Sequence, residues 1–164
     1  EKDMFSSEVV FLGTYRPARE EILMKLGQVN LTIWGGGRYP RLNGNTTVNG
    51  QVTPEEACKI YNASKIVINI NHQQSIYGGN TKVFETTACG ALQITESKPD
   101  ITRAFSPGEE IVCYDSPEEL SDLVKHYLAH ETDRRTIARQ GINRSHKDHT
   151  YKDRMKQLLD AIRA

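Results

Sequence analysis

The segment over residues 65–96 constrains the fold of this chain more than any other stretch does. Its first part, residues 66–70, is a nearly continuous β-branched run, which is typical of a strand that is covered on both faces. A glycine-containing loop follows, and then a helical pattern over residues 81–89 with one apolar stripe. A second apolar run over residues 91–94 predicts another strand. We therefore expect one strand–helix–strand unit here.

The loop before that helix has the features of an anion site. Gly78 and Gly79 permit a close backbone approach. Asn80 is a favourable N-cap for a helix that begins at Thr81, and Gly90 is expected to end that helix. Because unpaired N–H groups and the positive end of the helix dipole meet at such an N-terminus, the pattern predicts that this loop binds an anion.

The rest of the chain alternates between strand and helix patterns. Further strands are expected over residues 9–12, 31–34, 48–52 and 110–114, and further helices over residues 17–26, 53–64, 99–105, 117–128, 132–145 and 151–162. Thr53 with Glu56 predicts a capping box, and Ser116 begins another capped helix. The last helix has one apolar stripe, formed by Tyr151, Met155, Leu158, Leu159 and Ile162. The alternation predicts an α/β domain with a parallel sheet and helices on both faces.

Composition narrows the class of protein. With 164 residues, the chain is long enough for one domain with a substantial core. Its formal net charge of zero argues against a general nucleic-acid-binding protein, because such proteins usually carry a basic stripe. No apolar run approaches the length of a membrane span, and no signal peptide is expected. Since Cys58, Cys89 and Cys113 lack metal-like spacing, we expect reduced thiols that serve in packing, and a cytoplasmic protein.

Polar and glycine-rich loops follow several of the predicted strands, at residues 13–16, 35–38, 69–72 and 77–80. Ligands of open parallel sheets bind beyond the carboxyl ends of the strands, and the predicted architecture brings these loops to that edge. A glycine after a strand is by itself mostly a requirement of the turn. Together, the four loops predict a nucleotide-like binding site.

Two kinds of phosphate contact are available at this edge. Backbone N–H groups near residues 79–82 can hold a diphosphate, and Arg16 or Lys82 can add charge-assisted contacts. Glu85 lies one turn further along, on the side of Thr81, where its carboxylate can bind a ribose diol. Two alternatives stay open: Glu85 as a solvated residue paired with Lys82 at i,i+3, and Arg16 as a surface arginine.

Patterns of catalytic and metal-binding residues are absent from the sequence. His72 is a lone histidine near the predicted edge, and His146 and His149 have no ligand-like cluster around them. The first strand is not followed by Gly-x-Gly-x-x-Gly, which argues against a dinucleotide oxidoreductase, and the P-loop pattern is missing as well. No Asp-x-Asp pattern occurs. We therefore assign no catalytic residue, no metal site and no cofactor.

Three motifs together resemble the C-terminal half of retaining GT-B glycosyltransferases of the group 1, family-4-like type. They are GTYR at residues 13–16, YNASKI at residues 61–66 and NTKVFETTACG at residues 80–90. Within that group the chain is most similar to the spore-maturation-type branch, whose helix reads roughly Asn-x-Arg-x-Phe-Glu-x-x-Ala-Cys-Gly. The tail around His149 and Arg154 also resembles that branch, and the likeness spans about residues 9–162.

The resemblance implies that residues 1–164 form a single Rossmann-like, three-layer α/β/α domain, one half of a GT-B fold, that binds a nucleotide-diphosphate sugar. The donor-binding residues that it implies are Gly13, Arg16, Tyr77, Gly78, Gly79, Asn80, Thr81, Lys82 and Glu85. Glu85 matches the carboxylate that holds the donor ribose, while the helix start and Arg16 lie at the diphosphate. The base is expected near the loop after the second strand or near residues 48–53. The reaction implied is metal-independent hexosyl transfer with retention.

Two positions depart from the family pattern. In the wider group a second acid lies eight positions before the ribose acid, and here that position is Tyr77. The lysine that usually accompanies the first-loop arginine has no clear counterpart, and Arg19 or Lys82 is its candidate substitute. Because GT-B enzymes close a cleft between two such domains, we expect an N-terminal GT-B domain as a partner in cis. The isolated chain is then expected to bind donor weakly and to be inactive.

Two other functions stay open at this point. The first is a non-catalytic structural module that binds a nucleotide or a glycan, which the missing acid at Tyr77 supports. The second is a GT-B-fold nucleotide-sugar epimerase, which needs additional acid–base residues near the sugar, and His72 is the candidate.

Overall fold

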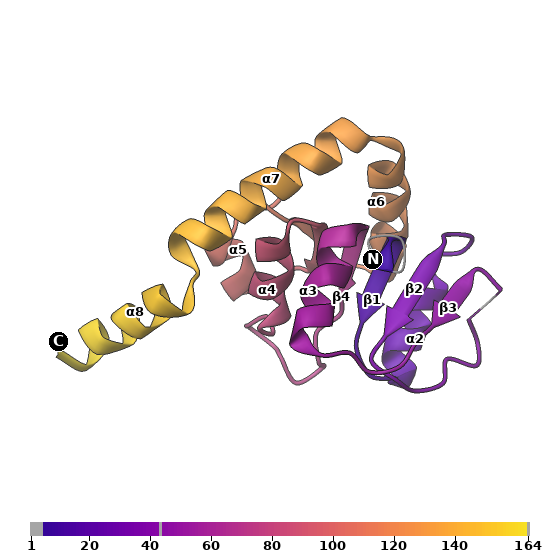
Figure 1. The fold of residues 1–164 in the computed structure, drawn as a ribbon, viewed down its shortest axis with the longest axis horizontal. Helices are drawn as coiled ribbons and strands as arrows, with labels where there is room; N and C mark the ends of the chain where they lie inside the picture. Colours follow the sequence, from indigo (N-terminus) through magenta and orange to yellow (C-terminus); the bar gives the residue numbers. More distant parts are fainter. Residues whose placement is uncertain (1–4, 43, 164) are drawn as a thin grey trace.

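The computed structural model describes residues 5–42 and 44–163, and the centre of this part of the chain is a six-stranded sheet (Figure 1). The strands are β1 (Ser7–Leu12), β2 (Leu31–Trp34), β3 (Thr46–Val48), β4 (Ser64–Asn69), β5 (Leu92–Glu96) and β6 (Val112–Tyr114). Their order is β3-β2-β1-β4-β5-β6, and every neighbouring pair is parallel. The predicted Rossmann-like α/β class is therefore confirmed.

Helices cover both faces of this sheet and form the outer layers. They are α2 (Pro17–Met24), α3 (Pro54–Ala63), α4 (Lys82–Cys89), α5 (Pro99–Ala104), α6 (Pro117–Ala129) and α7 (Glu131–Asp148), and a further helix, α8 (Tyr151–Arg163), follows them. Side chains of β1 alternate between the two faces, as the period of a strand requires. Phe11 packs in a core cluster with residues of α2 and α6, whereas Val10 packs with Ile60 and Tyr61 of α3.

The two predicted capped helix starts are confirmed. At the start of α3, Thr53 Oγ1 accepts from the N–H of Glu56 at 3.2 Å, and the Glu56 carboxylate accepts from the N–H of Thr53 at 2.8 Å. Ser116 accepts from the N–H of Glu119 at 3.2 Å at the start of α6. Gly90 ends α4 in the left-handed region, with φ 97°. Side-chain hydrogen bonds therefore set the starts of α3 and α6, and the backbone conformation of Gly90 sets the end of α4.

Three local predictions are wrong. Asn80 is not the N-cap of α4, because that helix begins at Lys82 and the side-chain amide of Asn80 is bonded to Asn69 instead. The short strand that was expected over residues 48–52 is β3 at Thr46–Val48, which pairs with β2. Cys58 does not serve in packing, since its side chain is exposed on α3.

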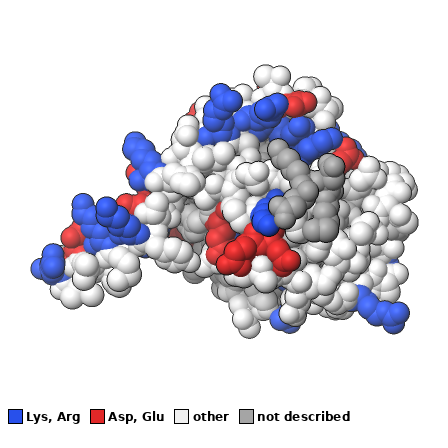
Figure 2. Space-filling model, in the orientation of Figure 1, with Lys and Arg blue, Asp and Glu red and all other residues white. Residues whose placement is uncertain are grey.

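The two C-terminal helices lie differently on the domain. Ile137 and Ala138 of α7 are buried in the core, whereas α8 has no buried residue and projects away from the sheet (Figure 1). The apolar stripe of α8 is exposed, with Tyr151 at 80% and Ile162 at 72%. Figure 2 shows Lys and Arg along α7. On α8, Lys and Arg lie on the side that faces away from the apolar stripe (Figure 2). None of the described helices is long and apolar enough to cross a membrane.

Candidate functional site

Two cationic side chains approach each other where the strand order reverses, between β1 and β4. Lys82, in the first turn of α4, donates from Nζ to the carbonyl oxygen of Leu12 at 2.6 Å, at the end of β1. Arg19, in α2, donates to the carbonyl oxygens of Thr14 at 3.1 Å and Ile70 at 3.3 Å. It thereby joins the loops that follow β1 and β4. Ligands of open parallel sheets bind in the crevice at such a reversal.

Both cations are held by backbone oxygens and not by carboxylates. Burial lowers the pKa of Lys82 most, the nearby Arg19 lowers it further, and Glu85 raises it. Burial also lowers the pKa of Arg19, whose guanidinium carbon lies 5.7 Å from the centre of the Phe11 ring. Within the described residues, neither cation forms an ion pair. The crevice therefore has an excess of positive charge, which a bound anion would offset.

Asparagine side chains form a network beside the two cations. Asn69 and Asn80 exchange two hydrogen bonds between their side-chain amides, at 3.2 and 3.0 Å. Asn71 Oδ1 accepts from the N–H of Asn80 at 3.1 Å, and the N–H of Asn71 donates to Glu96 at 3.2 Å. Asn71 Nδ2 is buried and has no partner among the described residues. Such an unpaired donor is costly unless a ligand or a water molecule accepts from it.

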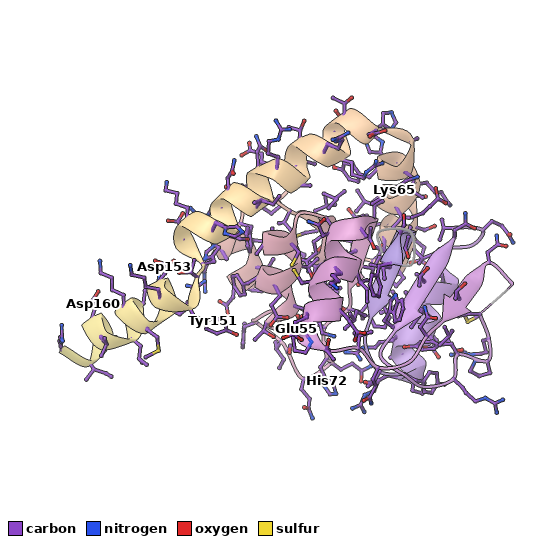
Figure 3. The ribbon with its side chains drawn as sticks, in the orientation of Figure 1. Glu55, Lys65, His72, Tyr151, Asp153 and Asp160 are labelled. Carbon is purple, nitrogen blue, oxygen red and sulfur yellow. The ribbon has the colours of Figure 1, made fainter. Side chains whose placement is uncertain are left out.

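A cavity of about 780 Å³ opens between α2 and the loops after β4 and β5. Its polar lining comes from Arg16, Arg19, Glu21, Asn71, His72, Gln73, Glu96 and Lys98. Figure 3 shows His72 at this edge of the domain. His72 is exposed, and its Nδ1 accepts from the N–H of Gln74 at 3.3 Å, so its own loop orients the ring. The cavity thus joins the loop after β1 to the buried amide of Asn71.

A second cavity, of about 890 Å³, lies beside the loop that follows β2. Its lining is Tyr15, Gly37, Arg38, Tyr39, Pro40 and Val48. The rings of Tyr15 and Tyr39 meet edge to face, with centroids 5.2 Å apart. A Cβ on Gly35 would lie 2.8 Å from the backbone of Gly13, and a Cβ on Gly37 would overlap the Cβ of Tyr15. Glycine is therefore required for this loop to approach the loop after β1.

The glycine loop before α4 is packed closely against neighbouring helices. A Cβ on Gly79 would lie 2.7 Å from the side chain of Val83, and one on Gly78 would lie 3.3 Å from a carboxylate oxygen of α5. The N–H groups of Val83 and of the next two residues already donate to carbonyl oxygens of the preceding turn. The N–H groups of Thr81 and Lys82 have no acceptor within the part of the chain that the structure describes. They are free donors of the kind that bind anions at helix N-termini.

Glu85 and Tyr77 both face solvent. The i,i+3 ion pair between Glu85 and Lys82 does not form, because the ammonium of Lys82 reaches the carbonyl oxygen of Leu12 instead. Tyr77 is 69% exposed, and its carbonyl oxygen accepts from the N–H of Asp100 at 3.1 Å. Both side chains are therefore available to a ligand.

The structure divides the predicted residues between two sides of the crevice. Arg16 lines the cavity next to α2, whereas Lys82 and the glycine loop lie on the side of α4. Gly13 directly follows β1, and its carbonyl oxygen accepts from the hydroxyl of Tyr39 at 3.2 Å. The sequence interpretation missed Glu96 and Lys98. Both occur at the end of β5, so the rule that ligand residues follow parallel strands could have identified them.

A family model described as glycosyl transferase-like matches residues 16–160 of this chain. A search of curated protein sequences found no match.

Solved structures show the same fold at low sequence identity. The C-terminal domain of the group 1 glycosyl transferase LpcC from Francisella tularensis has a TM-score of 0.70 at 16% identity, over 92% of this chain and 91% of that chain. Sucrose-phosphate synthase from Thermosynechococcus elongatus has a TM-score of 0.70 at 20% identity, over 94% of this chain and 45% of that chain. HepE of Anabaena, solved in complex with UDP, has a TM-score of 0.76 at 12% identity, over 98% of this chain and 50% of that chain. This chain therefore spans about half the length of the first structures that it matches.

Proposed function

The chain belongs to the glycosyl transferase-like family, and on that premise we propose that it binds the nucleotide-diphosphate sugar of a glycosyltransferase at the carboxyl ends of β1 and β4. The observation that carries the proposal is the pair of cations in the crevice. Lys82 and Arg19 are held 2.6 to 3.3 Å from backbone carbonyl oxygens, and neither forms an ion pair with a carboxylate of the described residues. A diphosphate supplies the missing negative charge.

The diphosphate is proposed to bind between the start of α4 and the loop after β1. The free N–H groups of Thr81 and Lys82 are proposed to donate to phosphate oxygens at the helix N-terminus. The ammonium of Lys82 uses one of its three N–H donors in the hydrogen bond to the carbonyl oxygen of Leu12. Two donors are left for the ligand. Arg16 adds a charge from the other side of the crevice.

The ribose and the base extend from this diphosphate along the sheet edge. Glu85 has an exposed carboxylate without an ion-pair partner in the described residues, and it is proposed to accept hydrogen bonds from the ribose diol. The base is proposed to bind at the cavity beside the loop after β2, where Tyr15 and Tyr39 offer aromatic surface.

Transfer itself is proposed to retain the configuration of a hexose-type unit, in an enzyme of the spore-maturation type. The cations and the helix N-terminus stabilise the charge that develops on the leaving diphosphate, without a metal ion. An N-terminal GT-B domain in cis is proposed to supply the acceptor site, so the isolated chain binds donor weakly and does not turn over. The enzyme is proposed to act in the cytoplasm.

Thermal unfolding with nucleotide diphosphates tests the donor site. UDP, GDP, ADP, dTDP and their sugars are each added to the chain, and UDP is a natural first choice because HepE was solved with it. A ligand at about 100 times its dissociation constant adds roughly 2.7 kcal/mol to the free energy of unfolding. That corresponds to a rise of several degrees in Tm for a domain of this size.

Glu85→Ala and Glu55→Ala form a matched pair of variants. Both glutamates are exposed and lie in the first turn of their helices, but Glu55 belongs to α3 (Figure 3). We expect the shift in Tm with one nucleotide diphosphate to disappear in Glu85→Ala and to persist in Glu55→Ala. Equal shifts in both variants would remove Glu85 from the site. A shift with none of the nucleotides in the complete protein would favour the non-catalytic module.

A further inference from the structure

Two thiols from different helices lie in contact at the surface of the domain. Cys58 is in the middle of α3, Cys89 is the last residue of α4, and their Sγ atoms are 3.2 Å apart. The two helices lie side by side (Figure 1). Cys58 is exposed and Cys89 is half-buried, so solvent reaches the pair.

Packing of the helices sets this contact. Asn62 lies one turn after Cys58 on the same side of α3, and its Nδ2 donates to the carbonyl oxygen of Cys89 at 3.0 Å. Gly90 then ends α4 in the left-handed region. The end of α4 is therefore fixed against the side of α3 that carries Cys58, and the two thiols stay within reach of each other.

From this geometry we propose that Cys58 and Cys89 are a reversible dithiol–disulfide pair that cross-links α3 to α4. The third cysteine does not compete for either partner, because Cys113 lies in β6 and packs in a separate cluster with Ile101 and Phe105. Among the described residues, no third His, Cys, Asp or Glu joins the pair to make a metal-ion site. Oxidation is thus the chemistry that the contact favours.

The oxidant is a peroxide, and the reaction has two steps. The sulfur of Cys58 attacks one oxygen of hydrogen peroxide, the O–O bond breaks, and water leaves as Cys58 becomes a sulfenic acid. The sulfur of Cys89 then attacks Sγ of Cys58, the S–O bond breaks, and a second water leaves with the proton of Cys89. Two thiols are oxidised to one disulfide, and the peroxide is reduced to two water molecules.

The two thiols differ in their environment in a way that fits this order. Burial and the neighbouring thiol of Cys58 raise the pKa of Cys89 to about 12, so Cys89 remains protonated at neutral pH. Cys58 is the exposed member that meets the oxidant first. Cys89 is already in contact with Cys58, and its proton is transferred to the departing hydroxyl as its sulfur attacks the sulfenic acid.

The cross-link also constrains the unfolded chain. The two residues are 31 positions apart, so the disulfide closes a loop of that length and removes conformations from the unfolded state. We expect the oxidised domain to unfold at a Tm higher by roughly 5–10 °C than the reduced domain.

Thiol titration and intact-mass measurement of the complete protein test the proposal. After treatment with hydrogen peroxide, we expect the count of reactive thiols in the unfolded protein to fall by two, through loss of Cys58 and Cys89. The mass should fall by two hydrogen atoms, no disulfide should link two protein molecules, and dithiothreitol should restore the thiol count and the mass. Non-reducing digestion should yield a peptide pair that contains Cys58 and Cys89.

Three serine variants identify the partners. Cys113→Ser should still lose two thiols to one disulfide, whereas Cys58→Ser and Cys89→Ser should form no intramolecular disulfide. The serine changes at Cys58 and Cys89 are at exposed or half-buried positions, and circular dichroism checks that each variant folds. A gain of oxygen atoms without a disulfide in the folded wild-type protein would overturn the proposal. So would a disulfide that includes Cys113, or a dimer linked through Cys58.

Discussion

At the residue scale, Glu20 shows how the fold accommodates a fully buried charge. Its carboxylate accepts from the backbone N–H of Arg41 at 2.8 Å and from Nε of Arg41 at 3.0 Å. Tyr15 donates to it at 3.4 Å. Burial alone would raise the pKa of Glu20, but the bonds from Arg41 lower it below its usual value of 4.5. The pair fixes the loop after β2 against α2.

This lowered pKa predicts a pH dependence of stability. A carboxyl whose pKa is lower in the folded state contributes stability above its unfolded pKa, and the contribution is lost as the pH falls through the folded pKa. Glu20→Gln should therefore unfold at a lower urea concentration than the wild type at neutral pH, and the difference should shrink below pH 4.5. Urea unfolding of both proteins at a series of pH values measures this difference in stability. Glu21→Gln is the control, because Glu21 meets the same arginine at 3.5 Å while 65% exposed, and such surface pairs stabilise little.

The close packing around Gly79 gives a second prediction at the scale of single residues. A Cβ there would lie 2.7 Å from Val83 and 2.9 Å from Ile101, both of which are buried. Gly79→Ala should lower the free energy of unfolding by about 1–3 kcal/mol, because the overpacked loop must move away from α4 and α5. Gly44→Ala is the matched control, since a Cβ there would have none of the described atoms within 4 Å beyond its own chain neighbours. A Gly79→Ala variant as stable as Gly44→Ala would show that the loop is loosely packed in solution.

Single residues also mark the limit of what the sequence predicts. An asparagine before a helical pattern is an ordinary N-cap, and the sequence contains nothing that distinguishes this use from another. In the structure Asn80 is bonded to Asn69 and Asn71, which belong to β4 and the loop after it. Partners nine and eleven positions earlier, brought back to Asn80 by the loop after β4, therefore decided its role, and a pattern of immediate neighbours could not reveal them.

At the scale of helices and strands, termini whose partners are local were predicted well. Thr53, Ser116 and Gly90 set helix ends through neighbours within four residues, and the structure has all three. The buried strands were found because their apolar runs reflect burial on both faces. The edge strand β3 was misplaced, since its residues are exposed or half-exposed and its position depends on pairing with β2.

The starts of α3 and α4 differ in capping, because Thr53 accepts a side-chain capping bond and Thr81 does not. This difference gives a prediction at the scale of helices. Thr53→Ala removes the hydrogen bond that the side chain accepts from the N–H of Glu56, and it should cost about 1 kcal/mol of unfolding free energy. Thr81→Ala is the matched change at the start of α4, where the threonine makes no capping bond, and it should cost almost nothing. Urea unfolding of both variants measures the difference. Equal losses would mean that capping is not what Thr53 contributes.

At the scale of the whole molecule, the alternation of strands and helices was enough to predict the sheet and its two covering layers. The crevice at the strand reversal follows from that topology, and it explains why loops from distant parts of the chain meet there. The bond from Lys82 to Leu12, across 70 positions, could not be predicted, because it depends on how α4 is placed over the end of β1.

Helix α8 shows the largest difference between what a sequence pattern usually indicates and what the structure has. Its apolar stripe has the helical spacing that usually indicates a buried face, yet Leu158 is 53% and Leu159 is 45% exposed. The contacts that hold α8 to the domain lie at its start. The His149 ring packs against Phe84 and Phe105 with centroids 5.2 and 4.8 Å away, and the Arg154 guanidinium lies over Phe84.

This arrangement predicts that the end of α8 contributes little to the stability of the domain. A chain that ends at Gln157 keeps His149 and Arg154 but lacks most of the apolar stripe, and its Tm should equal that of the 164-residue chain. His149→Ala, by contrast, removes a ring between two aromatic side chains and a bond to the carbonyl oxygen of Ala104 at 2.8 Å. That variant should lose about 1–2 kcal/mol. If the shortened chain melted several degrees lower while His149→Ala did not, the stripe would be covered in solution, and its apolar surface would stabilise the protein through that contact.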